Sequence, residues 1–268
     1  MNSHRTGTGR FLTALGAIGV KGRGLALAAM LVSTSALADA QSPSGAALNG
    51  PATPASGGAA SPSATSRSPQ SVASSVQAFY DQTRSVEAEF FQTYYSRIYD
   101  KYTRSSGSVK FAKPGRMRWD YSAPNGKVIV SDGKRLTMFE PGEDAADPGQ
   151  VFERAITDSE LPQALAFLTG TGKLGDDFTF RLLDAAAQGF PTGYVLELLP
   201  KKPTPHFERI LFYVDGDAKR AGLVHRVLIV DSAGNRNRID FKGPKFNRNI
   251  EVKVFAWQAP KNARKVNP

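Results

Sequence analysis

The sequence predicts an α+β protein in which about eleven antiparallel strands form a strongly curved meander, open or closed, with two main helices. Short runs of alternating apolar and polar residues recur from about residue 84 onward. Turn residues separate these runs at intervals of about 8 to 12 residues. Pro124-Asn125-Gly126 and Asp132-Gly133 are typical of tight turns that need a positive φ, and they predict antiparallel neighbours.

Residues 113–139 show the strand pattern most clearly. Along this segment Met117, Trp119 and Tyr121 occupy alternate positions, and charged residues lie between them. Because side chains alternate across a strand, one face is apolar and the other charged. A sheet of such strands has an apolar surface, which is filled either by the protein's own core or by a guest molecule. The local pattern leaves both alternatives open, and core packing is the more common one.

The remaining elements follow from periodicity. Apolar residues spaced four, three and four apart predict a helix over 71–83, and a switch to period two at Val86 begins the first long strand. A second strand is predicted over 107–112. After an acidic Pro/Gly loop, apolar residues over 161–170 predict a second helix within 141–176. Further strands are predicted over 178–183, 194–199, 207–214, 223–230, 237–241 and 250–255.

The first 70 residues differ from the rest of the chain. Residues 1–38 combine four basic residues, no acid and a short apolar run, which is typical of a secretory signal peptide cleaved after Ala38 or Ala40. An uncleaved membrane anchor is the alternative. Residues 39–70 consist almost entirely of Ser, Ala, Pro, Gly, Thr and Asn, which predicts a flexible tether, with a glycosylated stalk as the alternative.

Residues 71–268 suit a single domain with one core. The chain contains no cysteine, so neither a disulfide nor a lipidated N-terminal cysteine is possible. Removal of the predicted signal takes four basic residues and lowers the net charge from +10 to +6. The basic residues are spread along the chain without a known nucleic-acid motif, so we expect no nucleic-acid binding. A preference for anionic partners or lipid headgroups stays open.

Sequence motifs for catalysis were not found. His206 and His225 have no obvious partner, and neither the zinc-protease motif H-E-x-x-H nor the hydrolase motif G-x-S-x-G occurs. Asp132, Asp215 and Asp231 lie beside Gly or Ser, where Asp usually caps its own turn. We therefore expect no catalytic residue, no metal site, no cofactor and no enzyme activity.

From about Val86 to Val266 the chain resembles the LolA family of periplasmic outer-membrane lipoprotein carriers. The resemblance depends on motifs that occur in the family's order. These are Phe90-Phe91-Gln92, Gly107-Ser108-Val109, Lys113-Pro114, Met117-Arg118-Trp119, Val130-Ser131-Asp132-Gly133-Lys134 and Asp231-Ser232-Ala233-Gly234-Asn235, with Arg238, Phe241, Phe255, Pro260 and Val266 after them. It covers nearly the whole predicted domain.

The resemblance implies an incomplete antiparallel β-barrel whose hydrophobic interior is covered by helices and receives acyl chains. The implied partners are acylated lipoproteins, an inner-membrane lipoprotein-releasing transporter and an outer-membrane acceptor, with the carrier a periplasmic monomer that needs no cofactor. The residues expected to line the cavity and its mouth are Phe90, Val109, Phe111, Met117, Trp119, Tyr121, Val128, Val130, Met138, Leu165 and Leu168.

Two positions depart from the family pattern. The basic residue before the proline is commonly Arg and is thought to hold a lid through backbone carbonyls, whereas this chain has Lys113. Lys keeps the charge and loses the fork geometry of Arg, so Lys113 or Arg116 is expected at the lid or partner contact. Met117 stands where an aromatic is common. A carrier or sensor of glycolipid or phospholipid, and a protein-interaction module with a dry core, remain the alternatives.

Overall fold

The computed structural model describes residues 67–142, 144, 146–156 and 172–266. Two α-helices, two 3₁₀ turns and twelve strands form in these ranges. The helices are α2 (Pro69–Gln82), α4 (Leu174–Asp177), η1 (Ala218–Arg220) and η2 (Val252–Phe255). The strands are β1 (Ser85–Ser96), β2 (Lys101–Ala112), β3 (Arg116–Tyr121), β4 (Val128–Asp132), β5 (Arg135–Glu140), β6 (Gln150–Ala155), β7 (Phe178–Leu183), β8 (Gly193–Pro200), β9 (Arg209–Asp215), β10 (Val224–Val230), β11 (Arg236–Phe246) and β12 (Arg264–Val266).

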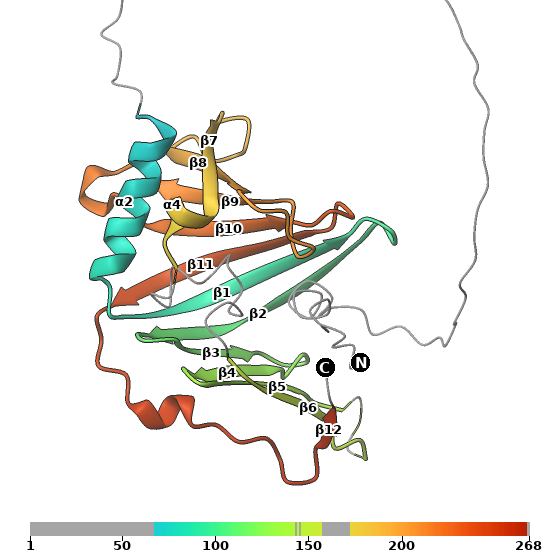
Figure 1. Ribbon diagram of the computed structural model, residues 1–268. Coiled ribbons are helices and arrows are strands. Elements are labelled where there is room, and N and C mark those ends of the chain that lie inside the picture. Colours follow the sequence, from blue (N-terminus) through green and yellow to red (C-terminus); the bar gives the residue numbers. More distant parts are fainter. Residues whose placement is uncertain (1–66, 143, 145, 157–171, 267–268) are drawn as a thin grey trace, which may run out of the picture. The chain divides into compact units, whose positions relative to one another are not determined.

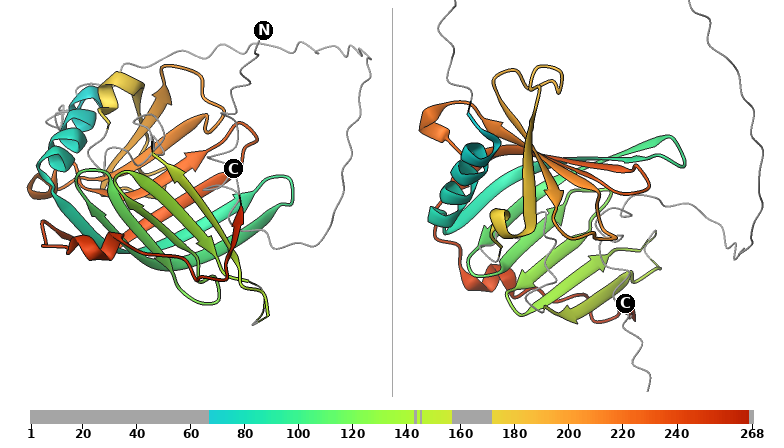
Figure 2. Two further views of the ribbon diagram at one scale, coloured as in Figure 1. Left: turned by 60° about the horizontal axis from the view of Figure 1, so that its bottom comes forward. Right: turned by 45° about the horizontal axis from the view of Figure 1, so that its top comes forward.

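All twelve strands belong to one sheet, in the order β12-β6-β5-β4-β3-β2-β1-β11-β10-β9-β8-β7. Among the described strands, neighbours are antiparallel except for β12, which pairs in parallel with β6. The sheet is curved and does not close on itself, because β12 and β7 lie at its two edges (Figures 1 and 2). The predicted α+β fold with an incomplete antiparallel barrel is confirmed, with twelve strands in place of about eleven.

The predicted alternation of β3 is present in the structure. Met117, Trp119 and Tyr121 are buried, and the charged residues between them are partly exposed. The predicted turns also form, and their glycines have the expected positive φ: 61° at Gly126 and 96° at Gly133. These are conformations that favour glycine, so the two turns set the antiparallel pairing of β3, β4 and β5.

Helix α2 forms where the apolar spacing predicts it and begins at Pro69. The Ser68 hydroxyl accepts a hydrogen bond from the backbone N–H of Ser71, a standard N-cap. Val72, Val76 and Tyr80 on one side of the helix are buried. This side packs against β7, β8 and α4, so α2 covers part of the apolar face of the sheet (Figure 1).

Four sequence predictions either fall outside the described residues or differ from the structure. The predicted helix over 161–170, with Leu165 and Leu168, and the predicted signal peptide lie outside the described residues. Strand β6 lies within the segment interpreted as loop and helix, so that interpretation missed a strand. The predicted strand over 250–255 is wrong, because this segment forms the 3₁₀ turn η2 and packs Phe255 against the sheet face. Among the described residues, no helix has the length and apolarity needed to cross a membrane.

Candidate functional site

The candidate site is the apolar face of the sheet, here called the inner face and defined as the face that carries Trp119. One row of its side chains can be followed from strand to strand through the register. The row consists of Ala88, Val109, Trp119, Ile129, Met138 and Phe152, on β1 to β6 in turn. Every member is apolar, and all but Phe152 are buried.

Aromatic rings gather at the centre of this face. The Phe90 ring lies 4.8 Å from the Trp119 ring and 4.9 Å from the Tyr121 ring, both edge to face. The Phe111 and Phe241 rings lie 5.7 Å and 6.3 Å from the Trp119 ring. Edge-to-face contacts fix ring directions and add to the energy of burial. The aromatic cluster of Phe90, Phe111, Trp119, Tyr121 and Phe241 therefore forms the best-defined part of the inner face.

The cluster requires a glycine on β2. Gly107 pairs with Phe90 on β1 and with Tyr121 on β3. A Cβ atom at position 107 would overlap the backbone oxygen of Asp120 and lie 2.8 Å from the Phe90 ring. The Gly107-Ser108-Val109 motif thus has a physical reason, since only glycine lets these strands approach closely under the ring.

The other half of the sheet contributes further apolar side chains to the same core. Residues from β8, β9 and β10 belong to one apolar cluster with the aromatic residues of β1 to β3, so the curved sheet encloses a single interior. The most deeply buried of them are Leu196, Leu198, Ile210, Phe212 and Val227.

A buried polar chain interrupts this apolar surface. The Tyr121 hydroxyl donates to the Gln92 side-chain oxygen at 3.0 Å, and the Gln92 amide donates to the Asn237 side-chain oxygen at 2.9 Å. Burial raises the pKa of the Tyr121 hydroxyl, which therefore stays protonated and remains a donor. The sequence prediction assigned no role to Gln92, whose partner Asn237 lies 145 residues away.

Lys113 connects the sheet to α2. Its ammonium group donates to the backbone oxygen of Tyr80 at 2.6 Å and to that of Asp81 at 3.2 Å. The last turn of α2 has no basic residue of its own, so Lys113 supplies the positive charge that a helix C-terminus favours. Arg116 does not share this contact: it donates to the Lys113 backbone oxygen at 2.6 Å and lies over the Phe255 ring.

The structure brings together most of the predicted cavity residues. Seven of them lie buried on the inner face: Phe90, Val109, Phe111, Met117, Trp119, Tyr121 and Met138. Val128 and Val130 pair with Asp120 and Arg118 and point to the opposite face, so their placement in the cavity lining was wrong. Leu165 and Leu168 lie outside the described residues. Ile129, Phe152 and Phe241 were missed, although Ile129 alternates with Val128 and Val130 and lies opposite Trp119.

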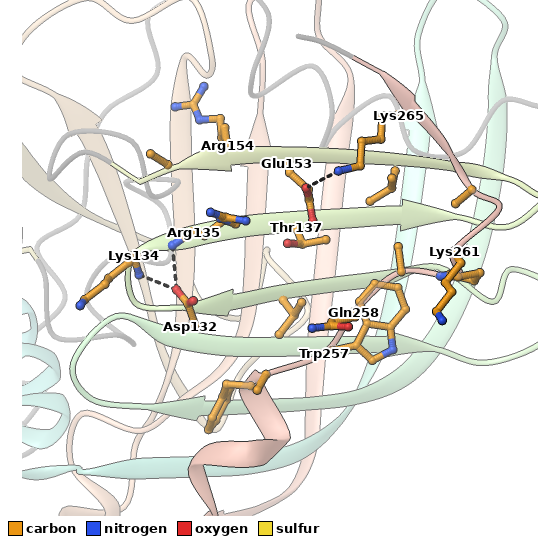
Figure 3. A pocket seen from close by; sticks show the side chains of 18 residues that line it. Asp132, Lys134, Arg135, Thr137, Glu153, Arg154, Trp257, Gln258, Lys261 and Lys265 are labelled. Atoms are coloured by element: carbon orange, nitrogen blue, oxygen red, sulfur yellow. Dashed lines mark hydrogen bonds and ion pairs between the residues drawn. The ribbon is translucent and has the colours of Figure 1, made fainter.

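The opposite, outer face of β4 to β6 has a pocket of different chemistry (Figure 3). The C-terminal segment runs over this face, and a space of about 1010 Å³ remains between the segment and the strands. Its charged lining comprises Asp132, Glu153, Lys134, Arg135, Arg154, Lys261 and Lys265. Basic residues outnumber acids here, and the Lys265 ammonium lies 3.7 Å from a Glu153 oxygen. The lining thus combines charged side chains with apolar ones such as Phe255 and Trp257, whereas the row on the inner face is apolar throughout.

The titratable side chains of His225 and Asp215 contact each other. The His225 ring nitrogen lies 2.7 Å from an Asp215 oxygen, so His225 has a partner that was not obvious from the sequence. Asp215 also accepts from the Asp217 backbone N–H at 2.8 Å, as expected for a turn residue. Among the described residues, no three His, Asp or Glu side chains gather as a possible metal site.

An open antiparallel sheet with an apolar inner face, partly covered by a helix tied to the sheet by a basic residue, defines a class of proteins built around a hydrophobic interior. Residues 81–258 match the family model described as outer membrane lipoprotein carrier protein LolA. The chain belongs to this family.

The chain is also similar to individual proteins. The chain is 27% identical over 186 residues to the outer-membrane lipoprotein carrier protein of Nitrosospira multiformis, covering 69% of this chain and 84% of the relative. It is 29% identical over 198 residues to that of Chromobacterium violaceum, covering 71% and 85%. A crystal structure of a LolA superfamily protein from Nitrosomonas europaea aligns with a TM-score of 0.38 at 14% identity, covering 71% of this chain and 98% of that one.

Proposed function

We propose that this protein is a periplasmic carrier that holds the acyl chains of lipoproteins against the inner face of its sheet and moves them from the inner to the outer membrane. Membership of the LolA family supports the class of cargo. The observation that supports the location is the apolar row with its aromatic cluster, whose side chains would contact hydrocarbon that entered the curved sheet.

The energetics suit transfer without catalysis. Each methylene removed from water contributes about 0.8 kcal/mol, so acyl chains would be held strongly by apolar contact alone. Such contact is non-directional and lacks chemical specificity, and release would therefore follow contact with an acceptor that shields the chains better. An inner-membrane transporter that loads the carrier and an outer-membrane acceptor that unloads it complete the proposal. The signal peptide predicted over 1–38 would deliver the protein to the periplasm.

The two tryptophans of the chain allow a direct test. Trp119 lies in the aromatic cluster, whereas Trp257 lies on the outer face, where its ring is 5.7 Å from the Phe139 ring. Trp257→Phe leaves Trp119 as the only indole, and Trp119→Phe leaves Trp257. A synthetic triacylated lipopeptide with brominated acyl chains quenches an indole only on close contact. We expect it to quench the emission of Trp119 and leave that of Trp257 unchanged.

The same experiment can contradict the proposal. Quenching of Trp257 but not Trp119 would place the cargo in the outer-face pocket. No quenching of either indole would favour an interaction module with a dry core. Mass spectrometry of lipids extracted from protein purified gently from its native periplasm identifies the cargo: triacylated lipoprotein supports the proposal, whereas free phospholipid or glycolipid alone would favour a carrier or sensor of those lipids.

A further inference from the structure

The turn between β1 and β2 exposes an unusual set of side chains. Six large apolar or aromatic side chains are exposed in the described part of the chain, and three of them, Ile98, Tyr99 and Tyr102, lie within five consecutive residues. Their exposed fractions are 78%, 68% and 55%. This hairpin tip, residues 97–102, projects beyond the ends of β3, β4 and β5 (Figure 1).

Positive charge surrounds the exposed apolar side chains. Arg97, Lys101 and Arg104 are all exposed, and among the described residues no carboxylate forms an ion pair with them. The acid of the tip, Asp100, accepts a hydrogen bond from the Tyr95 hydroxyl at 2.9 Å. The tip therefore presents apolar and aromatic side chains within a net positive field.

Several contacts hold the tip in a defined conformation. The Tyr95 and Tyr102 rings lie 4.8 Å apart, and the Arg236 guanidinium lies 4.7 Å from the centre of the Tyr95 ring. The Arg97 backbone N–H donates to the Asn235 side chain at 2.9 Å. Ile98 and Tyr99 are consequently presented on a supported hairpin, and little conformational entropy is lost when they meet a partner.

We propose that the hairpin tip docks this protein on the surface of an anionic phospholipid bilayer. Ile98 and Tyr99 enter the interfacial layer, where aliphatic and tyrosine side chains are favoured, and Arg97, Lys101 and Arg104 contact lipid phosphates. A stable protein partner usually needs about 20 to 30 residues on each side of the interface, and a narrow projecting turn offers far fewer. A bilayer accepts a small apolar projection ringed by cations, which is what the tip provides.

This docking would orient the protein. The register places the tip at one end of the β1–β2 hairpin, where Ser96 pairs with Lys101, and places the contact between Lys113 and α2 beyond the other end, where Ser85 pairs with Ala112. The end of the sheet that carries the Tyr121–Gln92–Asn237 chain would then face the membrane, and α2 would lie on the far side. The inference does not depend on what occupies the interior.

Vesicle flotation of the full mature protein without lipopeptide tests the proposal. Vesicles of phosphatidylglycerol and phosphatidylethanolamine are compared with vesicles of phosphatidylcholine. We expect binding to the anionic vesicles that weakens as salt is added, because headgroup attraction is screened. The double variants Ile98→Ser/Tyr99→Ser and Arg97→Gln/Lys101→Gln should each lower the partition coefficient about tenfold or more.

Matched controls keep the test specific. Val252 is 65% exposed in η2, so Val252→Ser removes a comparable exposed aliphatic side chain far from the tip in sequence and should leave binding unchanged. Lys245→Gln/Arg248→Gln removes two exposed charges near the opposite end of β11 and should have little effect. Equal losses for tip and control variants would overturn the proposal. Absence of vesicle binding by the unmodified protein would also overturn it.

A second readout separates this proposal from the proposed function. Brominated lipopeptide should still quench Trp119 in the tip variants, because their inner face is unaltered. Normal quenching with lost vesicle binding supports docking by the tip. Tip variants that bind vesicles normally and fail only in lipopeptide binding would refute it.

Discussion

The two ends of the β1–β2 hairpin differ more than their shared strands would suggest. At the end nearest α2, Val86 and Phe111 are buried opposite each other, and Lys113 binds the helix C-terminus. At the other end, Tyr95 and Tyr102 pair on a turn that exposes Ile98 and Tyr99. The first end contributes to stability and the second leaves apolar side chains available. The difference shows that a continuous ladder of hydrogen bonds can join a buried, stabilising region to an exposed apolar one.

The largest difference in stability is expected between variants of two aromatic residues on β2. Phe111→Ala removes a ring that is 1% exposed, whereas Tyr102→Ala removes one that is 55% exposed. The first change should lower the free energy of unfolding by about 3 to 5 kcal/mol. The second should cost less than about 1 kcal/mol. Denaturant unfolding of both variants measures the difference, and similar losses would show that the two ends do not differ.

A smaller effect is expected midway along the hairpin. Gly107→Ala forces the strands or the Phe90 ring to shift, because the added Cβ overlaps the Asp120 backbone oxygen. We expect a loss of about 1 to 3 kcal/mol in the free energy of unfolding. Gly175→Ala is the control, since nothing lies within 4 Å of a Cβ there. If both changes were tolerated equally, the close approach at Gly107 would not limit stability.

The two hydrogen bonds from Lys113 to α2 should contribute about 1 kcal/mol to the free energy of unfolding. Lys113→Met keeps much of the apolar stem and removes the charge, so amide hydrogen exchange should accelerate in the last turn of α2 and remain unchanged at the hairpin tip. Lys113→Arg should restore most of the protection. Lys110→Met, on β2 three residues before Lys113, is the matched control. Uniform acceleration in every variant would mean that Lys113 does not act on the helix.

The smallest effect concerns pH. Burial pushes the pKa of Asp215 upward, but the contact with His225, the Asp217 N–H and nearby Arg220 outweigh it and leave the pKa lowered. A carboxylate with a lowered pKa in the fold stabilises the protein above its ordinary pKa, and this stabilisation is lost as pH falls through the lowered value. Asp215→Asn should therefore be less stable than the unmodified protein at neutral pH.

That stability difference should shrink on acidification below about pH 4. The site adjoins α2, because the Val224 N–H donates to the Tyr80 hydroxyl at 3.3 Å. The effect should accordingly appear in the exchange of α2 amides before that of the tip. Asp176→Asn, an exposed acid in α4, serves as the control. A difference that stays constant with pH would contradict the role of Asp215.

Local pattern predicted β3 well and β4 only in part. Met117, Trp119 and Tyr121 alternate with charged residues, so the pattern identified the buried face. Val128, Ile129 and Val130 form an unbroken apolar run, because Phe255 from a distant segment covers Val130 on the outer face. A strand that is apolar on both faces carries no phase information, and the assignment of Val128 and Val130 to the interior failed for this reason.

Long-range contacts explain the other errors. The apolar residues near Phe255 resemble a strand locally, yet the segment packs side chains on the sheet face and pairs with no strand until β12. The bond between Gln92 and Asn237 depends on β1 lying beside β11, which short-range periodicity cannot show. The family resemblance predicted the open barrel, whereas the strand register in the structure identified the residues that face its interior.

The pairing of β12 with β6 has a consequence for solubility. A sheet that does not close leaves backbone N–H and C=O groups free along its outermost strands, where another copy could add its own strand and begin aggregation. Arg264–Val266 pairs with Gln150–Phe152 in parallel, and Lys265 lies 3.7 Å from Glu153. These three residues thus cover the first half of β6 and add two charged side chains to that edge of the sheet. We expect β12 to hinder the addition of a strand from another copy, and its removal would expose the whole of β6 as an edge.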